Sequence, residues 1–176
     1  MNRPTWVTVV AVMGIVFSCW SLVSSGSMMM MPKFMDMQKK MMQTMENDAS
    51  SARMPESSRT MFKEMMDFPP WFATWSVVAG ILRLLISGCG LYASVIMMQL
   101  KPHAVRYFYL AVGASVVFTV VNTAVAVTAL SFIGYWYAFV GFGGVVIDMV
   151  MIIVTAVNDK SAFQQSGSAA ATELAV

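Results

Sequence analysis

Charged side chains are scarce in this sequence. Only 11% of its 176 residues are Asp, Glu, Lys or Arg, whereas 58% are hydrophobic and the mean hydropathy is +0.68. A soluble domain carries roughly 25% charged residues. So much apolar surface would aggregate in water, so we expect lipid to be the solvent of most of the chain. The net charge of +2 is small and no basic stripe is present, so nucleic acid is not a predicted partner.

Histidine and cysteine are almost absent. His103 is the only histidine, which argues against bis-histidine haem and against zinc sites that need two or more histidines. Cys19 and Cys89 form no CxxC pair, which argues against a disulfide framework. Both lie in apolar runs, so we expect buried thiols. No nucleophile has a base beside it and no phosphate-binding glycine loop is present, so we expect neither enzymatic activity nor a cofactor.

Long hydrophobic runs, by contrast, occur four times. A spanning helix needs roughly 20 mainly apolar residues. The runs that meet this length are about 6–23, 71–98, 107–133 and 135–157, and Trp or Tyr residues mark their ends. The pattern predicts an all-α membrane protein, with a single four-helix transmembrane domain over residues 1–157. Residues 158–176 are small and polar, which predicts a flexible tail.

The loop charges predict how the chain is oriented. The loop between the second and third spans carries Lys101 and Arg106, whereas the next loop carries no charge. Basic loops stay in the cytoplasm, so both termini are expected there, and Arg3 and Lys160 agree. The six basic residues of segment 28–68 oppose this orientation. We expect an inner or plasma membrane protein with both termini cytoplasmic.

Segment 28–68 holds most of the 19 methionines. Pro32 and Pro55 suit the first turn of a helix, and each piece that follows has an amphipathic pattern. The segment therefore predicts an extramembrane, methionine-rich helical hairpin between the first and second spans. The residues expected on its apolar face are Phe34, Met37, Met41, Met45, Met61, Phe62, Met65 and Met66. This face would pack on itself, lie on the lipid interface or receive a partner.

The same segment suggests a second chemistry. Thioether sulfur is a soft ligand that suits Cu(I), so a methionine cluster facing the periplasm is a candidate copper site. Its candidate ligands are Met35, Met37, Met41 and Met42. The methionines alternate with Phe and follow a helical period, however, which is typical of a packing face. We therefore expect no metal and keep copper handling as an alternative.

Three spans carry an isolated polar residue at similar predicted depth. Arg83 lies about twelve residues into the second span and Asp148 about thirteen into the fourth, or roughly 18–20 Å from the same membrane face. Asn122, in the third span, lies about eleven residues from that face. A charge at the bilayer centre is costly unless it is paired. We therefore expect an intramembrane polar layer in which Arg83 and Asp148 form an ion pair and Asn122 fills spare hydrogen-bonding capacity.

These patterns favour a non-catalytic accessory or scaffold subunit. It would sit in the lipid bilayer and dock a partner through the methionine-rich hairpin, and other membrane subunits or a second copy are the expected partners. The alternative is an oligomeric transporter or channel that uses Asp148 to bind a small cation or proton, because charged residues inside membranes often mark such pathways.

The topology can be tested with single engineered thiols in a chain whose two cysteines are replaced by serine. Thiols at positions 102 and 160 should react with an impermeant maleimide only after cells are permeabilised, because both would face the cytoplasm. A thiol at position 50 should react in intact cells. Labelling of all three positions from the same side would contradict four crossings.

Overall fold

The computed structural model describes residues 4–47, 69–129, 131–161 and 163. It contains four long helices, and the part of the chain that it describes has no strand. Each helix contains a stretch long and apolar enough to cross a membrane. The predicted all-helical class and the four candidate spans are thus confirmed. The helices are α1 (Thr5–Asn47), α3 (Pro70–Met98), α4 (Ala104–Ala129) and α5 (Ser131–Val157).

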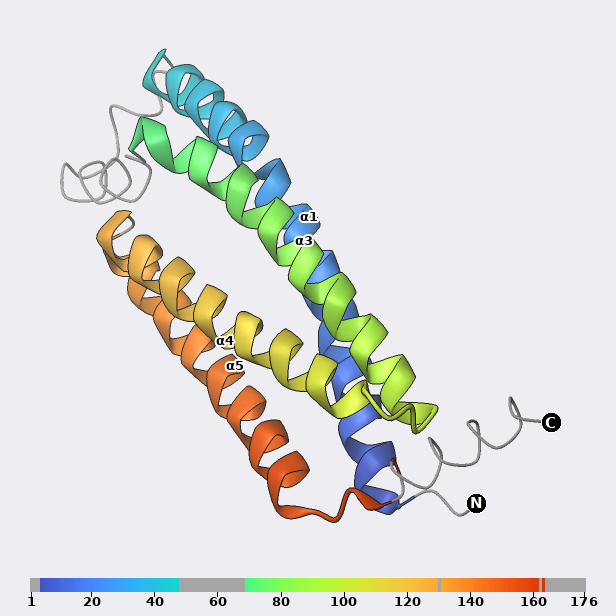
Figure 1. Cartoon of the computed structure of the whole chain (residues 1–176). Helices are drawn as coiled ribbons and strands as arrows, with labels where there is room; N and C mark the ends of the chain where they lie inside the picture. The colour runs from blue at the N-terminus through green and yellow to red at the C-terminus, as the bar shows by residue number, and fades with distance from the viewer. Residues whose placement is uncertain (1–3, 48–68, 130, 162, 164–176) are drawn as a thin grey trace.

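The helices form two antiparallel pairs, α1 with α3 and α4 with α5 (Figure 1). The end of the bundle where α1 begins and α5 ends is called here the Trp6 end, and the end where α3 begins and α4 ends is called the Pro70 end. The pairs converge at the Trp6 end, at the lower right of Figure 1, and their ribbons diverge toward the Pro70 end.

The main hydrophobic core lies at the Trp6 end, where all four helices contribute buried side chains. Its members are Val7, Val10, Ala11, Ala93, Ile96, Met97, Leu100, Ala104, Phe108, Ala111, Val112, Met151 and Phe163. Phe163 belongs to the segment predicted to be a flexible tail, yet its ring packs against Trp6 with the centroids 6.1 Å apart. An aromatic side chain that reaches apolar neighbours is more stable buried than in water. The other residues of the tail beyond Ser161 lie outside the described part.

Small residues set the distance between α1 and α3. At two levels a glycine of one helix faces a serine side chain of the other, and at a third Gly80 faces the backbone carbonyl of Ser25 and the Met29 side chain, so the backbones approach closely. The contacts are Gly14 with Ser94, Ser18 with Gly90, and Ser25 with Gly80. A Cβ added to Gly90 would lie 2.9 Å from the Ser18 hydroxyl oxygen, closer than real side chains approach. This contact fixes the register of the two helices.

The first span was predicted to end near residue 23, with a separate helix starting near Pro32. The prediction of a separate helix was wrong, because α1 continues unbroken to Asn47 with Pro32 inside it. Two serines in the middle of α1 donate to carbonyls one turn back, from Ser24 Oγ to Trp20 O and from Ser25 Oγ to Ser21 O. α3 also packs along this stretch, at Ser25, and such packing commonly overrides local propensity. The first arm of the predicted hairpin is therefore part of α1, and its second arm lies outside the described residues.

A tight turn joins α3 to α4. Leu100 takes a left-handed conformation with φ of 55°, and its N–H donates to Met97 O while that of Lys101 donates to Ile96 O. This pair of hydrogen bonds closes the end of a helix, usually with glycine at the left-handed position. Leu100 is tolerated there because its side chain is buried in the core at the Trp6 end. The turn places α4 directly beside α3.

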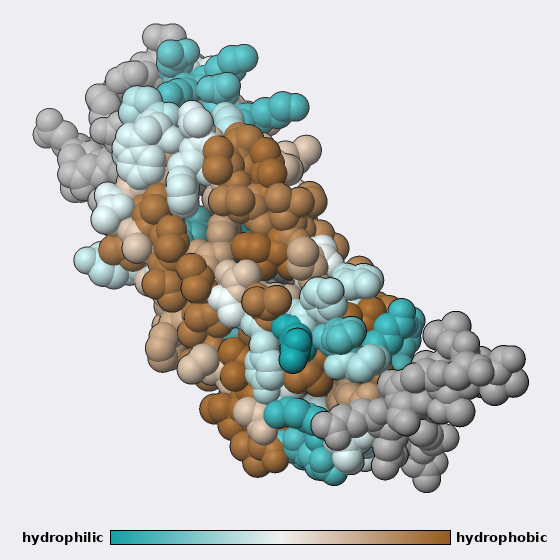
Figure 2. All heavy atoms as spheres, in the orientation of Figure 1, coloured by the Kyte–Doolittle hydropathy of each residue, from teal (hydrophilic) through white to brown (hydrophobic). Residues whose placement is uncertain are grey.

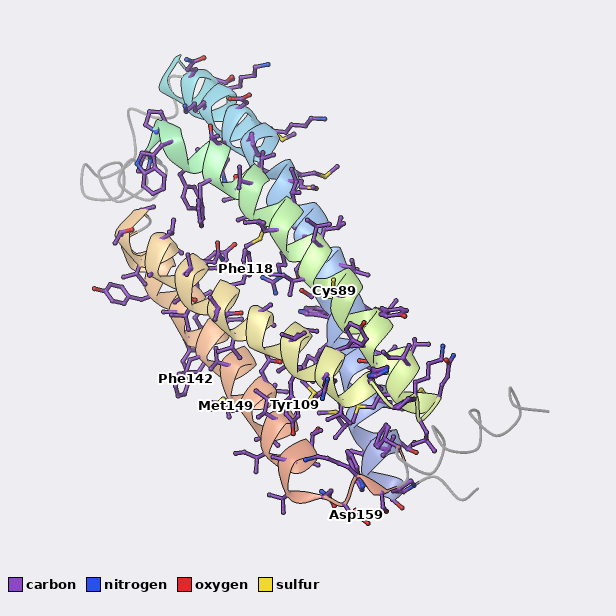
Figure 3. All side chains as sticks on the ribbon, viewed as in Figure 1. Cys89, Tyr109, Phe118, Phe142, Met149 and Asp159 are labelled. Carbon is purple, nitrogen blue, oxygen red and sulfur yellow. The ribbon has the colours of Figure 1, made fainter. Side chains whose placement is uncertain are left out.

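Apolar side chains cover most of the middle of the face seen in Figure 2, and polar residues gather mainly toward its two ends. This is the surface expected of a bundle whose middle faces lipid. Cys19 and Cys89 are both exposed, so their predicted burial was wrong. Cys89 lies on the visible side of α3 in Figure 3. An apolar run places a residue in lipid as readily as in a protein core, and these two thiols lie on the outer surface.

Two glycines of α5 provide a matched test of packing. A Cβ on Gly134 would lie 2.5 Å from the Ala126 carbonyl oxygen and 2.7 Å from Val127 Cα, whereas one on Gly143 would meet nothing within 4 Å. We expect Gly134→Ala to lower the free energy of unfolding by about 1–3 kcal/mol, because backbone must shift. Gly143→Ala should be neutral or slightly stabilising. Thermal unfolding in detergent measures both, and equal effects would contradict the close contact.

Candidate functional sites: a cavity between the helix pairs and an exposed methionine surface

A cavity of about 790 Å³ lies between the two helix pairs and is lined by residues of all four helices. Arg83, Asp148 and Asn122, the three residues of the predicted polar layer, all line it. Aromatic side chains form much of the rest of its wall. These are Phe17, Trp20, Phe34, Phe72, Trp75, Phe118 and Tyr137. Figure 3 shows Phe118 at the side of α4 that faces α3.

Arg83 is partly buried on α3, and its guanidinium Nε donates to Ser21 Oγ on α1 at 3.0 Å. Ser87, one turn further along α3, has its hydroxyl 2.7 Å from Ser21 Oγ and 2.7 Å from the Arg83 carbonyl oxygen. The close contact of α1 with α3 therefore supplies a hydroxyl cluster that positions the arginine. Hydrogen bonds to charged groups are stronger than those between neutral groups.

Asp148 is partly buried on α5, and the side chain of Ser115 on α4 is a polar neighbour that lines the same cavity. The predicted ion pair does not form, because within the described chain Arg83 bonds to Ser21 and the two charges lie more than 4.0 Å apart. The reason is the order of the helices. α3 pairs with α1 and packs on α4, while α5 pairs with α4, so the cavity separates Arg83 from Asp148.

Asn122 accepts a hydrogen bond from Trp75 Nε1 at 3.2 Å, which bridges α4 to α3. Trp75 is eight residues from Arg83, or about 12 Å along the helix toward the Pro70 end. Asn122 therefore satisfies a tryptophan rather than the charges. Beyond this bond Phe72 and Ala126 form a small apolar cluster, which packs the two pairs together near the Pro70 end.

Sequence reasoning missed the serines of this site. Ser21 and Ser87 contact Arg83, and Ser115 lines the same cavity as Asp148. A smaller cavity of about 60 Å³ continues toward the Trp6 end, and Asp148 lines this one as well. The signal in the sequence was the helical spacing of Ser18, Ser21 and Ser25 on the first span, which places three hydroxyls on one face.

The second candidate site is the methionine surface of α1, defined as Met30, Phe34, Met37 and Met41. Each of these side chains is between 53% and 59% exposed. They follow one another at steps of four, three and four residues, so they share one face of the helix. The residues of α1 that contact α3 lie about half a turn away on the opposite face.

The remaining methionine predictions have different outcomes. Met35, one of the candidate copper ligands, is buried on another face of α1, so its side chain does not converge with those of Met37 and Met41. The side chains of Met42 and Met45 lie outside the described part. So do the predicted face residues of the second arm, which are Met61, Phe62, Met65 and Met66. Within the described ranges no cluster of three or more His, Cys, Asp or Glu side chains could hold a metal ion.

No protein-family model, curated protein or solved structure matches this chain. Its function is therefore inferred from the geometry of the two sites.

The Trp75–Asn122 bond can be measured by a double-mutant cycle. Trp75→Phe and Asn122→Ala each remove one partner, and the two losses in unfolding free energy should overlap by about 0.6–1.7 kcal/mol, the range of hydrogen bonds between membrane helices. Trp71→Phe is the control, because Trp71 lies on the same helix and contacts Phe72 instead. Its effect should add to that of Asn122→Ala. Strict additivity for Trp75 would contradict the bond.

Proposed function

We propose that this protein is a non-catalytic accessory or scaffold subunit of a membrane, with both termini in the cytoplasm. It binds another membrane protein through the methionine surface of α1. The observation that carries the proposal is this row of four exposed apolar side chains near the Pro70 end. In the proposed orientation, that end lies on the non-cytoplasmic side.

The length of α1 supports this assignment. Its 43 residues span about 65 Å, whereas the hydrocarbon core is about 30 Å thick. The register of Gly14 with Ser94 and of Ser18 with Gly90 places Pro70 opposite residue 38 of α1. Residues 39–47 thus extend past the start of α3 by about 13 Å. Met41 lies in this extension, so α3 does not cover it, and exposed apolar side chains at such a position mark an interaction site.

The pattern of the surface specifies its partner. Steps of four, three and four residues are those of a coiled-coil seam, so the partner is an amphipathic helix with a matching seam. Lys33 and Lys40 are exposed and precede seam residues Phe34 and Met41 by one position, so both lie on the same flank. The partner helix therefore carries acidic residues along that flank. Methionine is flexible and polarisable, which suits a surface that adapts to its partner.

A photo-crosslinking amino acid at position 37, within the surface, tests the proposal in native membranes. We expect a discrete adduct whose crosslinked peptide, identified by mass spectrometry, is an amphipathic helix with acidic residues. The matched control is the same amino acid at position 39, two residues away on another face, which should give no such adduct. Replacing Lys33 and Lys40 by Glu should reduce the yield of this adduct about tenfold, because the glutamates would face the acidic residues of the partner helix.

Three outcomes would contradict this function. Adducts to lipid alone would show that the surface lies on the membrane interface. An adduct with a second copy of this chain would show that the surface mediates self-association and does not bind a different protein. Equal adducts from positions 37 and 39 would show that contacts at this end are unspecific.

A further inference from the structure

The cavity presents two opposite charges that do not neutralise each other. Arg83 faces it from α3 and Asp148 from α5, and among the described residues that line it these are the only formally charged side chains. An unpaired charge near the bilayer centre costs about 2.5–3.5 kcal/mol on insertion scales. The Ser21 hydroxyl offsets part of this cost for Arg83. The two charges do not form an ion pair with each other, so stabilisation of the bundle does not explain why both are present.

Arg83 keeps most of its donors available to the cavity. Its Nε is used by Ser21, and within the described chain neither Nη donates to a side chain or carbonyl. No side-chain nitrogen or oxygen of the described residues is both buried and unpartnered, so these two nitrogens are accessible. A guanidinium with two free NH2 groups is suited to bind a phosphate or carboxylate through both.

The pair of charges selects against simple ions. A lone cation at Asp148 would be repelled by Arg83, and a lone anion at Arg83 would be repelled by Asp148, since both line one cavity. Coulomb interactions between charges that line one cavity are screened less than between charges in bulk water. A ligand that carries both signs meets an attractive partner at each end. The arrangement therefore disfavours the cation or proton pathway considered from the sequence.

We infer that this cavity binds a zwitterion. Its anionic phosphate or carboxylate group contacts Arg83, its ammonium group contacts Asp148, and its apolar part packs on Phe17 and Phe118. The volume of about 790 Å³ lies within the range of roughly 300–1,000 Å³ typical of small-molecule pockets. The same chemistry is found in a zwitterionic lipid headgroup and in a soluble zwitterion. This inference does not rest on the proposed docking function.

Arg83 lies near the middle of α3, as the fourteenth of its 29 residues. Membrane proteins that move solutes place their binding sites near the bilayer midplane, where charged and irregular groups line a cavity. A headgroup or solute held at Arg83 is thus half-way between the two membrane faces.

Titration calorimetry on the full-length protein in maltoside detergent tests the inference with three probes. Dihexanoyl phosphatidylethanolamine carries both charges, dihexanoyl phosphatidylglycerol carries only the negative one, and glycerophosphoethanolamine is the headgroup without acyl chains. We expect the ethanolamine lipid to bind about tenfold more tightly than the glycerol lipid, a difference of about 1.4 kcal/mol. Glycerophosphoethanolamine binding within about threefold of its lipid indicates a soluble zwitterion, and weaker binding indicates a lipid.

Variants assign each charge to its group. Arg83→Gln should lower the affinity for both lipids by about tenfold, because the phosphate loses its partner. Asp148→Asn should abolish the difference in affinity between the two lipids, because the ammonium group loses its partner. Arg83→Lys keeps the charge and should retain part of the affinity, which covers the case in which Arg83→Gln fails to fold. Met149→Leu is the control, since Met149 neighbours Asp148 but lies exposed on α5 (Figure 3). It should leave all affinities unchanged.

The inference is overturned by any of three results. The first is the absence of saturable binding of the ethanolamine lipid to the natural sequence. The second is equal affinity for the two lipids. The third is an ethanolamine preference that persists in Asp148→Asn while the variant unfolds at the same temperature as the natural sequence.

Discussion

α1 and α3 approach each other through glycine and serine at three levels, and the polar interior of the bundle depends on this contact. Between membrane helices, where lipid is as apolar as the side chains, close backbone approach supplies much of the attraction. The register that it fixes brings Ser21 beside Arg83 and Ser87. The arginine is therefore held by groups that also hold the helices together, so its position follows from the packing.

The second helix pair joins the first unevenly. Large buried side chains fill the interface at the Trp6 end, and a smaller cluster around Phe72 closes it near the Pro70 end. Between these two contacts the cavity remains, with the Trp75–Asn122 bond across one part of it. The helices enclose this cavity only in part, so it is accessible from outside the bundle.

Much of this architecture could be predicted from residue order alone. The four apolar runs predicted the helices, and counting residues placed Arg83 and Asp148 at similar depth, where both line one cavity. Counting does not give lateral neighbours, however, so the predicted ion pair and the role of Asn122 depended on an unknown helix order. Pro32 and Phe163 were misjudged for a related reason. Packing against α3 and against Trp6, respectively, outweighs their local tendencies, and that packing is not visible in local sequence.

The unbroken course of α1 has a mechanical consequence. The helix from Ser21 to Met41 is roughly 30 Å long and forms one continuous arm. Ser21, at one end, bonds to the partly buried Arg83, and Met41, at the other end, is the last residue of the methionine surface. Proline at position 32 has no N–H to donate, which leaves the carbonyl of Met28 without its usual helical bond and makes this turn the softest point of the arm. A force on the outer part of α1 therefore bends the helix first at this turn, which leaves the Ser21 hydroxyl that orients the guanidinium in place.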